Sequence, residues 1–202
     1  MKLNRSTKYK PNGEYWHEGR QVLLTRIFGG VAFHGRKKFS WVVGEEDLYG
    51  ETHFYILCEA ETGEDDSIID IIDACRKMDA TYRTQRWFGR LDKNVSEIIV
   101  IQNKLLYAHG LRAFTCMDVP RIGEWIDEQV GSIHMLVRPA AKRLHFFGES
   151  MVTAELKSLP SKEMRADAFP RATALSNVIY GLLRYSGEVA GESLTPDPDP
   201  GF

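Results

Sequence analysis

The sequence predicts an α/β protein in which one sheet combines antiparallel and parallel strands. Three observations support this. Residues 21–59 contain three runs rich in β-branched and aromatic side chains, separated by turns. From residue 65 the apolar spacing changes to the helical period, and later short apolar runs alternate with helical segments. Such an order predicts a mixed sheet with helices on both faces.

The first part of this sheet is predicted as a three-stranded antiparallel meander. The strands span residues 21–33, 39–44 and 53–59, and the connecting turns contain residues 34–38 and 47–50. Gly29 and Gly30 interrupt the first run, which is typical of a β-bulge. Residues 1–19 are polar and basic, and are expected to form a flexible arm in front of a single domain spanning residues 20–187.

Helices and further strands are expected to alternate after the meander. Asp65, Asp66 and Ser67 can cap a helix over residues 68–80. Pro170 is compatible with the first turn of a last helix. The remaining segments are a parallel strand at 84–89, a helix at 95–109 in which 98–101 could instead be a strand, a strand at 113–119, a helix at 121–131, ambiguous segments at 132–137 and 143–147, a helix at 168–185 and a disordered tail at 188–202.

Composition favours a cytoplasmic globular protein. The chain has 202 residues, of which 43% are hydrophobic and 27% charged, enough for a sizeable core. No apolar run approaches the roughly 18–20 residues that cross a bilayer, so no membrane partner is expected. Cys58, Cys75 and Cys116 are far apart in sequence and odd in number, which favours reduced thiols over a disulfide scaffold.

The net charge of −2 conceals an uneven distribution. Residues 1–40 carry nine Lys or Arg against Glu14 and Glu18, whereas residues 41–70 carry ten acids and no Lys or Arg. A basic segment can attract phosphate, and a carboxylate cluster can hold a divalent cation. The alternative is that both are charged loops facing water.

Several stretches resemble a known family. Residues 26–33 (RIFGGVAF), 41–45 (WVVGE), 82–90 (YRTQRWFGR), 143–147 (RLHFF) and 166–172 (ADAFPRA) carry the resemblance. Together they resemble the ribonuclease H-like nuclease domain of phage large terminases, over roughly residues 23–185. The resemblance implies a ribonuclease H-like fold with the start of the last helix beside residues 88–90. It also implies cleavage of double-stranded DNA by two divalent ions.

The resemblance further implies acids on the first strand, at the end of the fourth strand and at the start of the last helix. The stretch from Arg26 to Gly30 has no acid, and Asp92 lies just beyond the expected position after Arg90. In an alternative register the first strand is residues 41–47. Under that register the catalytic residues are Glu45, Asp92 and Asp167, and the ligands of Mg²⁺ or Mn²⁺ are Glu45, Asp47 and Asp167. The structural alternatives are a strand-end acid for Glu45, a loop acid for Asp92 and a helix cap for Asp167.

Two groups of cations are candidates for contact with DNA. The turn after the first strand presents Arg36, Lys37 and Lys38 at a hairpin tip, where a phosphate backbone can approach. The second group interleaves cations with aromatic residues, as nucleic-acid surfaces often do, and consists of Arg83, Arg86 and Arg90. The alternative is ordinary surface arginines beside core aromatic residues.

Three functions follow from these observations. The first is a phage or prophage protein with a degenerate metal site, acting in DNA packaging or as an interaction module with DNA or packaging proteins. The second is an active Mg²⁺- or Mn²⁺-dependent DNA endonuclease. The third is a non-enzymatic assembly protein that does not bind DNA. The absence of GxxxxGK[ST] excludes a phosphate-binding loop, so this chain encodes no ATP-driven motor of that type.

Overall fold

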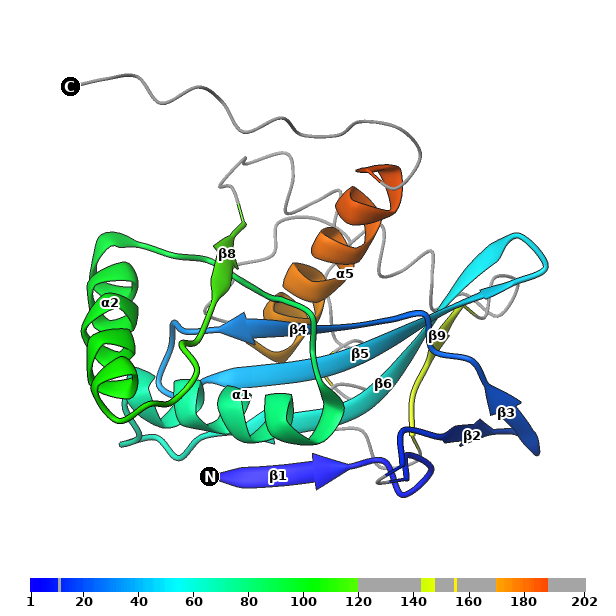
Figure 1. Ribbon diagram of the computed structural model, residues 1–202, viewed down its shortest axis with the longest axis horizontal. Helices are drawn as coiled ribbons and strands as arrows, with labels where there is room; N and C mark the ends of the chain where they lie inside the picture. Colours follow the sequence, from blue (N-terminus) through cyan, green and yellow to red (C-terminus); the bar gives the residue numbers. More distant parts are fainter. Residues whose placement is uncertain (11, 120–142, 148–154, 156–169, 189–202) are drawn as a thin grey trace.

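The computed structural model describes residues 1–10, 12–119, 143–147, 155 and 170–188. Within them one mixed sheet is packed between helices (Figure 1). In chain order the elements are β1 (Lys2–Arg5), β2 (Tyr15–His17), β3 (Arg20–Val22), β4 (Arg26–Ala32), β5 (Phe39–Leu48), β6 (Glu51–Glu61), α1 (Ile68–Tyr82), β7 (Trp87–Gly89), α2 (Lys93–Ala108), β8 (Cys116–Asp118), β9 (Leu144–His145) and α5 (Pro170–Glu188).

The strand order confirms the predicted α/β architecture. β4, β5 and β6 form the antiparallel meander, and β7 and β8 extend the sheet from β4 as parallel strands. The full order is β1-β6-β5-β4-β7-β8, with β9 also pairing with β6. A meander followed by parallel strands on the far side of the first strand is the ribonuclease H-like order that the resemblance implies.

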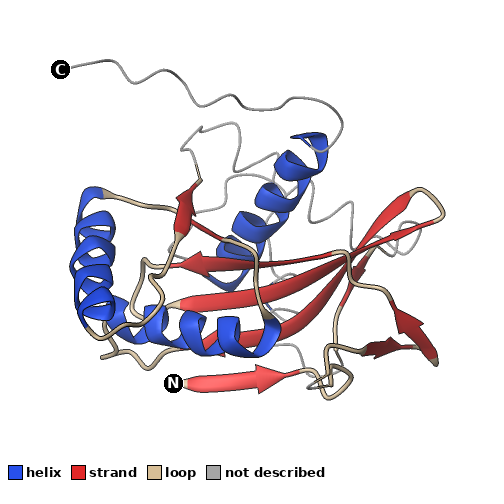
Figure 2. Cartoon of the chain, in the orientation of Figure 1, coloured by secondary structure: helices blue, strands red, loops and turns tan. Residues whose placement is uncertain are grey.

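Helices lie on both faces of the sheet (Figure 2), and each face carries a buried apolar cluster. On one face α5 packs on β4, β5 and β7 through residues that include Leu175, Val178 and Ile179. On the other face α1 packs on β5 and β6, and Val95 and Ile99 of α2 join the same buried cluster. Burial of an apolar stripe on each helix explains why the helical spacing is visible in the sequence.

Capping explains where α1 begins and ends. The Ser67 hydroxyl and the Asp70 carboxylate form a reciprocal capping box at its start. Arg83 adopts a left-handed conformation with φ of 55° at its end, and its N–H donates to the Asp79 carbonyl. Helix α2 begins at Asp92, whose carboxylate accepts from the Val95 N–H. Residues 98–101 are therefore helical rather than a strand.

The predicted bulge at Gly29 and Gly30 is wrong. Both glycines pair regularly with β5, and the irregularity lies between Val42 and Val43. The glycines serve close packing instead, because a Cβ at Gly29 would overlap the Trp87 ring. The expected first strand also divides in two. Its first residues form β3, which pairs with β2 in a separate ribbon, and β4 starts at Arg26.

The amino-terminal segment differs from the expected arm. β1 pairs with β6 from Lys2↔Glu61 to Arg5↔Cys58, and β2 contributes the buried Tyr15 to the core. Backbone pairing at a sheet edge holds a polar strand in place, and its apolar pattern is too weak to reveal this in the sequence. The helix expected at 121–131, the segment at 132–137 and the tail expected at 188–202, apart from Glu188, lie outside the described residues. Among the described helices, none combines the length and apolar character needed to cross a membrane.

Candidate nucleic-acid interface

The face of the sheet beneath α5 is filled by close apolar packing. Gly30 of β4 is level with Phe88 of β7, and both face α5. A Cβ at Gly30 would lie 2.8 Å from the Val178 Cβ and closer still to the Ala174 carbonyl oxygen. A Cβ at Gly181 would lie 2.6 Å from Cγ of Phe88 and closer to its ring edge. Helix α5 therefore lies directly on the two central parallel strands.

These are the strands on which the resemblance implies metal-binding acids. Instead, the ring centroids of Phe28 and Phe88 lie 5.7 Å apart in an edge contact. Mg²⁺ and Mn²⁺ require carboxylate, carbonyl or water oxygens. No group of three His, Cys, Asp or Glu side chains suited to a metal ion occurs in the described part of the chain. The residues present here do not fit a two-ion centre.

The structure separates the predicted catalytic carboxylates. Glu45 is paired with Arg26 at the start of β4, whereas Asp92 lies beyond Gly89, which is adjacent to Val31 near the end of β4. Arg26 and Val31 are five residues apart on β4, which corresponds to about 17 Å along the strand. The two ions of such a centre lie only about 4 Å apart. The expected grouping of Glu45 with Asp92 is therefore wrong, and Asp167 lies outside the described residues.

Each of the three described acids has a structural role. Glu45 is buried and receives three hydrogen bonds from the Arg26 guanidinium, at 2.6, 2.7 and 3.2 Å. Asp47 is exposed, and its Oδ1 accepts from the Gly50 N–H in the turn between β5 and β6. Asp92 is the N-cap of α2, with its Oδ1 2.8 Å from the Val95 nitrogen. A buried carboxylate neutralised by an arginine is a poor cation ligand, because the arginine already supplies the positive charge.

The described start of α5 does not lie beside β7. The Trp41 indole of β5 donates to the Arg171 carbonyl at 3.1 Å, whereas Phe88 of β7 meets Gly181, ten residues further along. The helix thus crosses the sheet with its first turn over β5. The expected position of this turn beside residues 88–90 is wrong, because the glycines at 30 and 181 let the middle of the helix settle there.

The predicted cations of the hairpin tip differ in exposure. The Lys37 ammonium pairs with Glu61 at 2.9 Å, and the Lys38 ammonium donates to the Asp66 carbonyl at 2.6 Å. Lys38 is buried, so it anchors the hairpin to the segment before α1 rather than facing a ligand. Arg36 is exposed at the tip.

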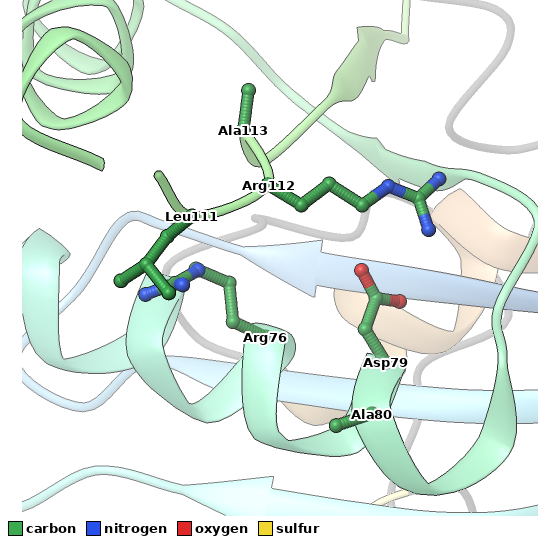
Figure 3. A pocket seen from close by; sticks show the side chains of 6 residues that line it. All are labelled: Arg76, Asp79, Ala80, Leu111, Arg112 and Ala113. Carbon is green, nitrogen blue, oxygen red and sulfur yellow. The ribbon is translucent and has the colours of Figure 1, made fainter. Parts of the chain in front are cut away.

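The second predicted group is divided between the two ends of β7. Arg90 follows the carboxyl end of this strand and is half-buried, whereas Arg83 and Arg86 precede its amino end and are exposed. Near the amino end the structure adds two arginines that the sequence reasoning did not include. Arg76 and Arg112 line a pocket of about 290 Å³ together with Asp79, Ala80, Leu111 and Ala113 (Figure 3).

We call Arg76, Arg83 and Arg112, which line the pocket or follow it at the end of α1, the arginine surface. Arg83 is held next to the pocket because its N–H donates to the Asp79 carbonyl at 2.8 Å. Arg86 lies on the other face of the sheet, because it contacts Sδ of Met117 at 3.2 Å and Met117 packs with the cluster beneath α5. In Figure 3 the Arg112 guanidinium and the Asp79 carboxylate point toward one another, and Arg76 reaches below Leu111.

Two carboxylates lie among these arginines. Asp73 lies 3.5 Å from Arg76, and Asp79 accepts from the Trp87 indole N–H at 2.8 Å. Burial raises the pKa of Asp79, and the Trp87 N–H, Arg112 and Arg76 act in the opposite direction. Arg76 lies on α1 and Arg83 is the left-handed residue that ends this helix, so helical spacing alone does not link them. Arg112 comes from a loop, whose position the sequence does not reveal.

Three histidines that are distant in sequence meet on the other side of the molecule. The His53 Nδ1 and His145 Nε2 atoms are 2.9 Å apart, and the His17 and His145 rings are 4.8 Å apart. The His145 ring stacks on Tyr55 at 4.5 Å. Burial, together with His17 and His53, lowers the pKa of His145 to about 4. These imidazoles join β2, β6 and β9.

Comparison with known proteins gives the following. No protein-family model matches the sequence, and no curated protein matches it. The large terminase nuclease of thermophilic phage G20c, solved with bound zinc, is 12% identical, with a TM-score of 0.48 over 83% of this chain and 90% of that one. The fowlpox virus Holliday junction resolvase is 9% identical, with a TM-score of 0.44 over 78% and 99% of the two chains. Thermus thermophilus RuvC is 13% identical, with a TM-score of 0.38 over 78% and 96%. The fold assignment rests on the strand order described above.

Proposed function

We propose that this chain is a ribonuclease H-like module that binds double-stranded DNA without cleaving it. The observation that carries the proposal is the arginine surface around the pocket at the amino end of β7. Guanidinium groups match phosphate in charge and in hydrogen-bond geometry, and phosphate contacts supply most of the sequence-independent affinity for DNA.

The arrangement of the arginine surface supports contact with an extended polyanion. Arg83 and Arg112 are exposed, and they come from two different segments of the chain. Arg76 and Arg112 flank the pocket, which is large enough for a phosphate group. Asp73 and Asp79 offset part of this charge, which lowers the expected affinity. Binding should weaken with salt, because each arginine–phosphate contact releases counterions from the DNA.

The loss of cleavage is proposed from the packing beneath α5. A carboxylate at Gly30 or Phe88 would have to replace close helix contacts. A degenerate metal site is therefore part of the proposal, and Mg²⁺ or Mn²⁺ has no assigned role. The resemblance to terminase nuclease domains supports a phage or prophage origin and a role in DNA packaging.

The test is binding of a fluorescent DNA duplex to the full chain, measured by anisotropy over a salt series. We expect the double variant Arg83→Ala/Arg112→Ala to bind about tenfold more weakly and to lower the salt slope by about two. Lys93→Ala is the control, because Lys93 is an exposed cation beyond the opposite end of β7, and the affinity of this variant should be unchanged.

Two other results would overturn the proposal. Absence of binding at low salt would favour an assembly protein without a DNA role. Plasmid cleavage in Mg²⁺ or Mn²⁺ that disappears in Asp92→Ala or Asp167→Ala would establish the endonuclease instead.

A further inference from the structure

Helix α2 exposes an apolar face to solvent. Val100, Ile101 and Leu105 are 53%, 60% and 54% exposed to solvent. Tyr107 near the end of the helix and Leu111 in the turn after it are also exposed. Half of the ten large exposed hydrophobic residues in the described part of the chain lie on α2 or on the turn after it. Apolar side chains gathered in one place on a surface indicate an interaction site.

The apolar face lies on the outer side of the helix. Val95, Ile99 and Leu106 are buried on the inner side, and Val95 and Ile99 belong to the core cluster beneath α1. In Figures 1 and 2, α2 stands at one end of the molecule, with no other described helix or strand on its outer side. Within the described residues, α2 therefore packs on its own domain only through its inner side.

The charged residues on this face could form ion pairs with the same residues of a second copy of the chain. Glu97 and Lys104 are both exposed, and they lie three residues before Val100 and three residues after Ile101. Seven residues separate them, which corresponds to about 10 Å along the helix axis. If a second α2 ran antiparallel across a twofold axis between Val100 and Ile101, Glu97 of each helix would face Lys104 of the other. An isologous contact requires this kind of self-complementarity.

We propose that this face of α2 pairs with the same face of a second copy of the chain, as an antiparallel helix pair. The apolar centre would consist of Val100 and Ile101 from both copies, with Leu105 further along, and two Glu97–Lys104 pairs would fix the register. The contact is small by the standards of stable dimers, so its dissociation constant should be on the order of 10 μM. The inference does not depend on the proposed function.

The test is sedimentation equilibrium of the full chain over about 1–200 μM, a range that brackets the expected constant. The wild-type mass should rise from 23.0 kDa toward twice that value. Ile101→Asp should remain monomeric throughout. An unchanged circular dichroism spectrum would show that this exposed substitution leaves the fold intact.

Charge reversal tests the proposed register. Glu97→Lys places like charges opposite Lys104 in a homodimer, and Lys104→Glu does the same opposite Glu97, so each variant alone should be at least tenfold weaker. A mixture of the two should form a heterodimer, because both pairs then have opposite charges. A wild-type chain that stays at 23.0 kDa over the whole range would refute the dimer. Failure of the mixture to associate would refute the antiparallel register. If another segment of the same chain covers this face, the wild-type chain should stay monomeric and the mixture of charge variants should not associate.

Discussion

The contact between α5 and the central strands can be tested at Gly30. Gly30→Ala adds a Cβ that would lie 2.8 Å from Cβ of Val178 and 2.9 Å from its nitrogen, whereas ordinary contacts begin near 3.4 Å. The helix must therefore move by about 0.6 Å at Val178, and by more at the Ala174 carbonyl. Most of the obstructing atoms belong to the helix backbone, so a change of side-chain rotamer cannot relieve the overlap.

The expected loss of stability follows from this displacement. Overpacking of this kind costs about 1–3 kcal/mol, and the lower backbone entropy of unfolded alanine returns less than about 1 kcal/mol. The net change should be about 2 kcal/mol, which lowers the Tm of a chain of this length by about 4–8 °C. Thermal unfolding followed by circular dichroism measures it directly.

Gly63→Ala is the matched control. Its new Cβ would meet Asp66 Oδ2 at 3.4 Å, which is an ordinary contact, and Gly63 has no positive φ. Its Tm should stay within about 2 °C of wild type, since compatible surface substitutions change stability by less than about 0.5 kcal/mol. If Gly30→Ala melted at the wild-type temperature, α5 would not be seated on β4 as described, and the argument against a metal site there would fail.

Three further predictions concern ionic and capping contacts. Glu45→Gln should lower the free energy of unfolding by about 3 kcal/mol in urea titrations, because the partly buried Arg26 loses its counter-charge; Glu45→Met/Arg26→Met should recover most of that loss. The pKa of His145 lies near 4 in the folded chain and near 6.5 when unfolded, so the unfolded state binds more protons between these values. The free energy of unfolding should therefore be highest above about pH 6.5 and fall by up to about 3 kcal/mol as the pH drops to about 4. In His145→Phe, urea denaturation over the same pH range should show a smaller fall. Ser67→Ala removes the α1 capping box and should cost about 1 kcal/mol, with hydrogen exchange increased in the first turn of α1; unchanged exchange there would contradict the cap.

Much of the fold could be predicted because it depends on local spacing. The turn-separated apolar runs gave the meander, and the helical stripes gave α1, α2 and α5 close to their observed limits. The prediction failed where long-range contacts decide the structure. Backbone pairing with β6 holds β1 in the sheet, although its own side chains carry no strand pattern. Glycine is required at positions 29 and 30 because Trp87 and α5 pack too close to leave room for a side chain, and not because the strand bulges there.

The candidate site was less predictable, because charged side chains acquire their roles from partners distant in sequence. Glu45 was a reasonable metal ligand until the β4–β5 register placed Arg26 opposite it. Lys38 was predicted to contact DNA because it lies in a basic run, whereas in the structure its ammonium donates to the Asp66 carbonyl. Arg83 was identified from its aromatic neighbours, whereas Arg112 joins it only because the loop of Arg112 folds against α1.

Titration of the full chain with Mn²⁺ in a calorimeter tests the central claim most directly. If α5 fills the region where paired carboxylates would have to stand, no saturable heat should appear up to about 1 mM, since Mn²⁺ needs several oxygen ligands in one place. Saturable binding that is abolished by Asp92→Asn or Asp167→Asn would contradict the claim and restore the metal-dependent nuclease.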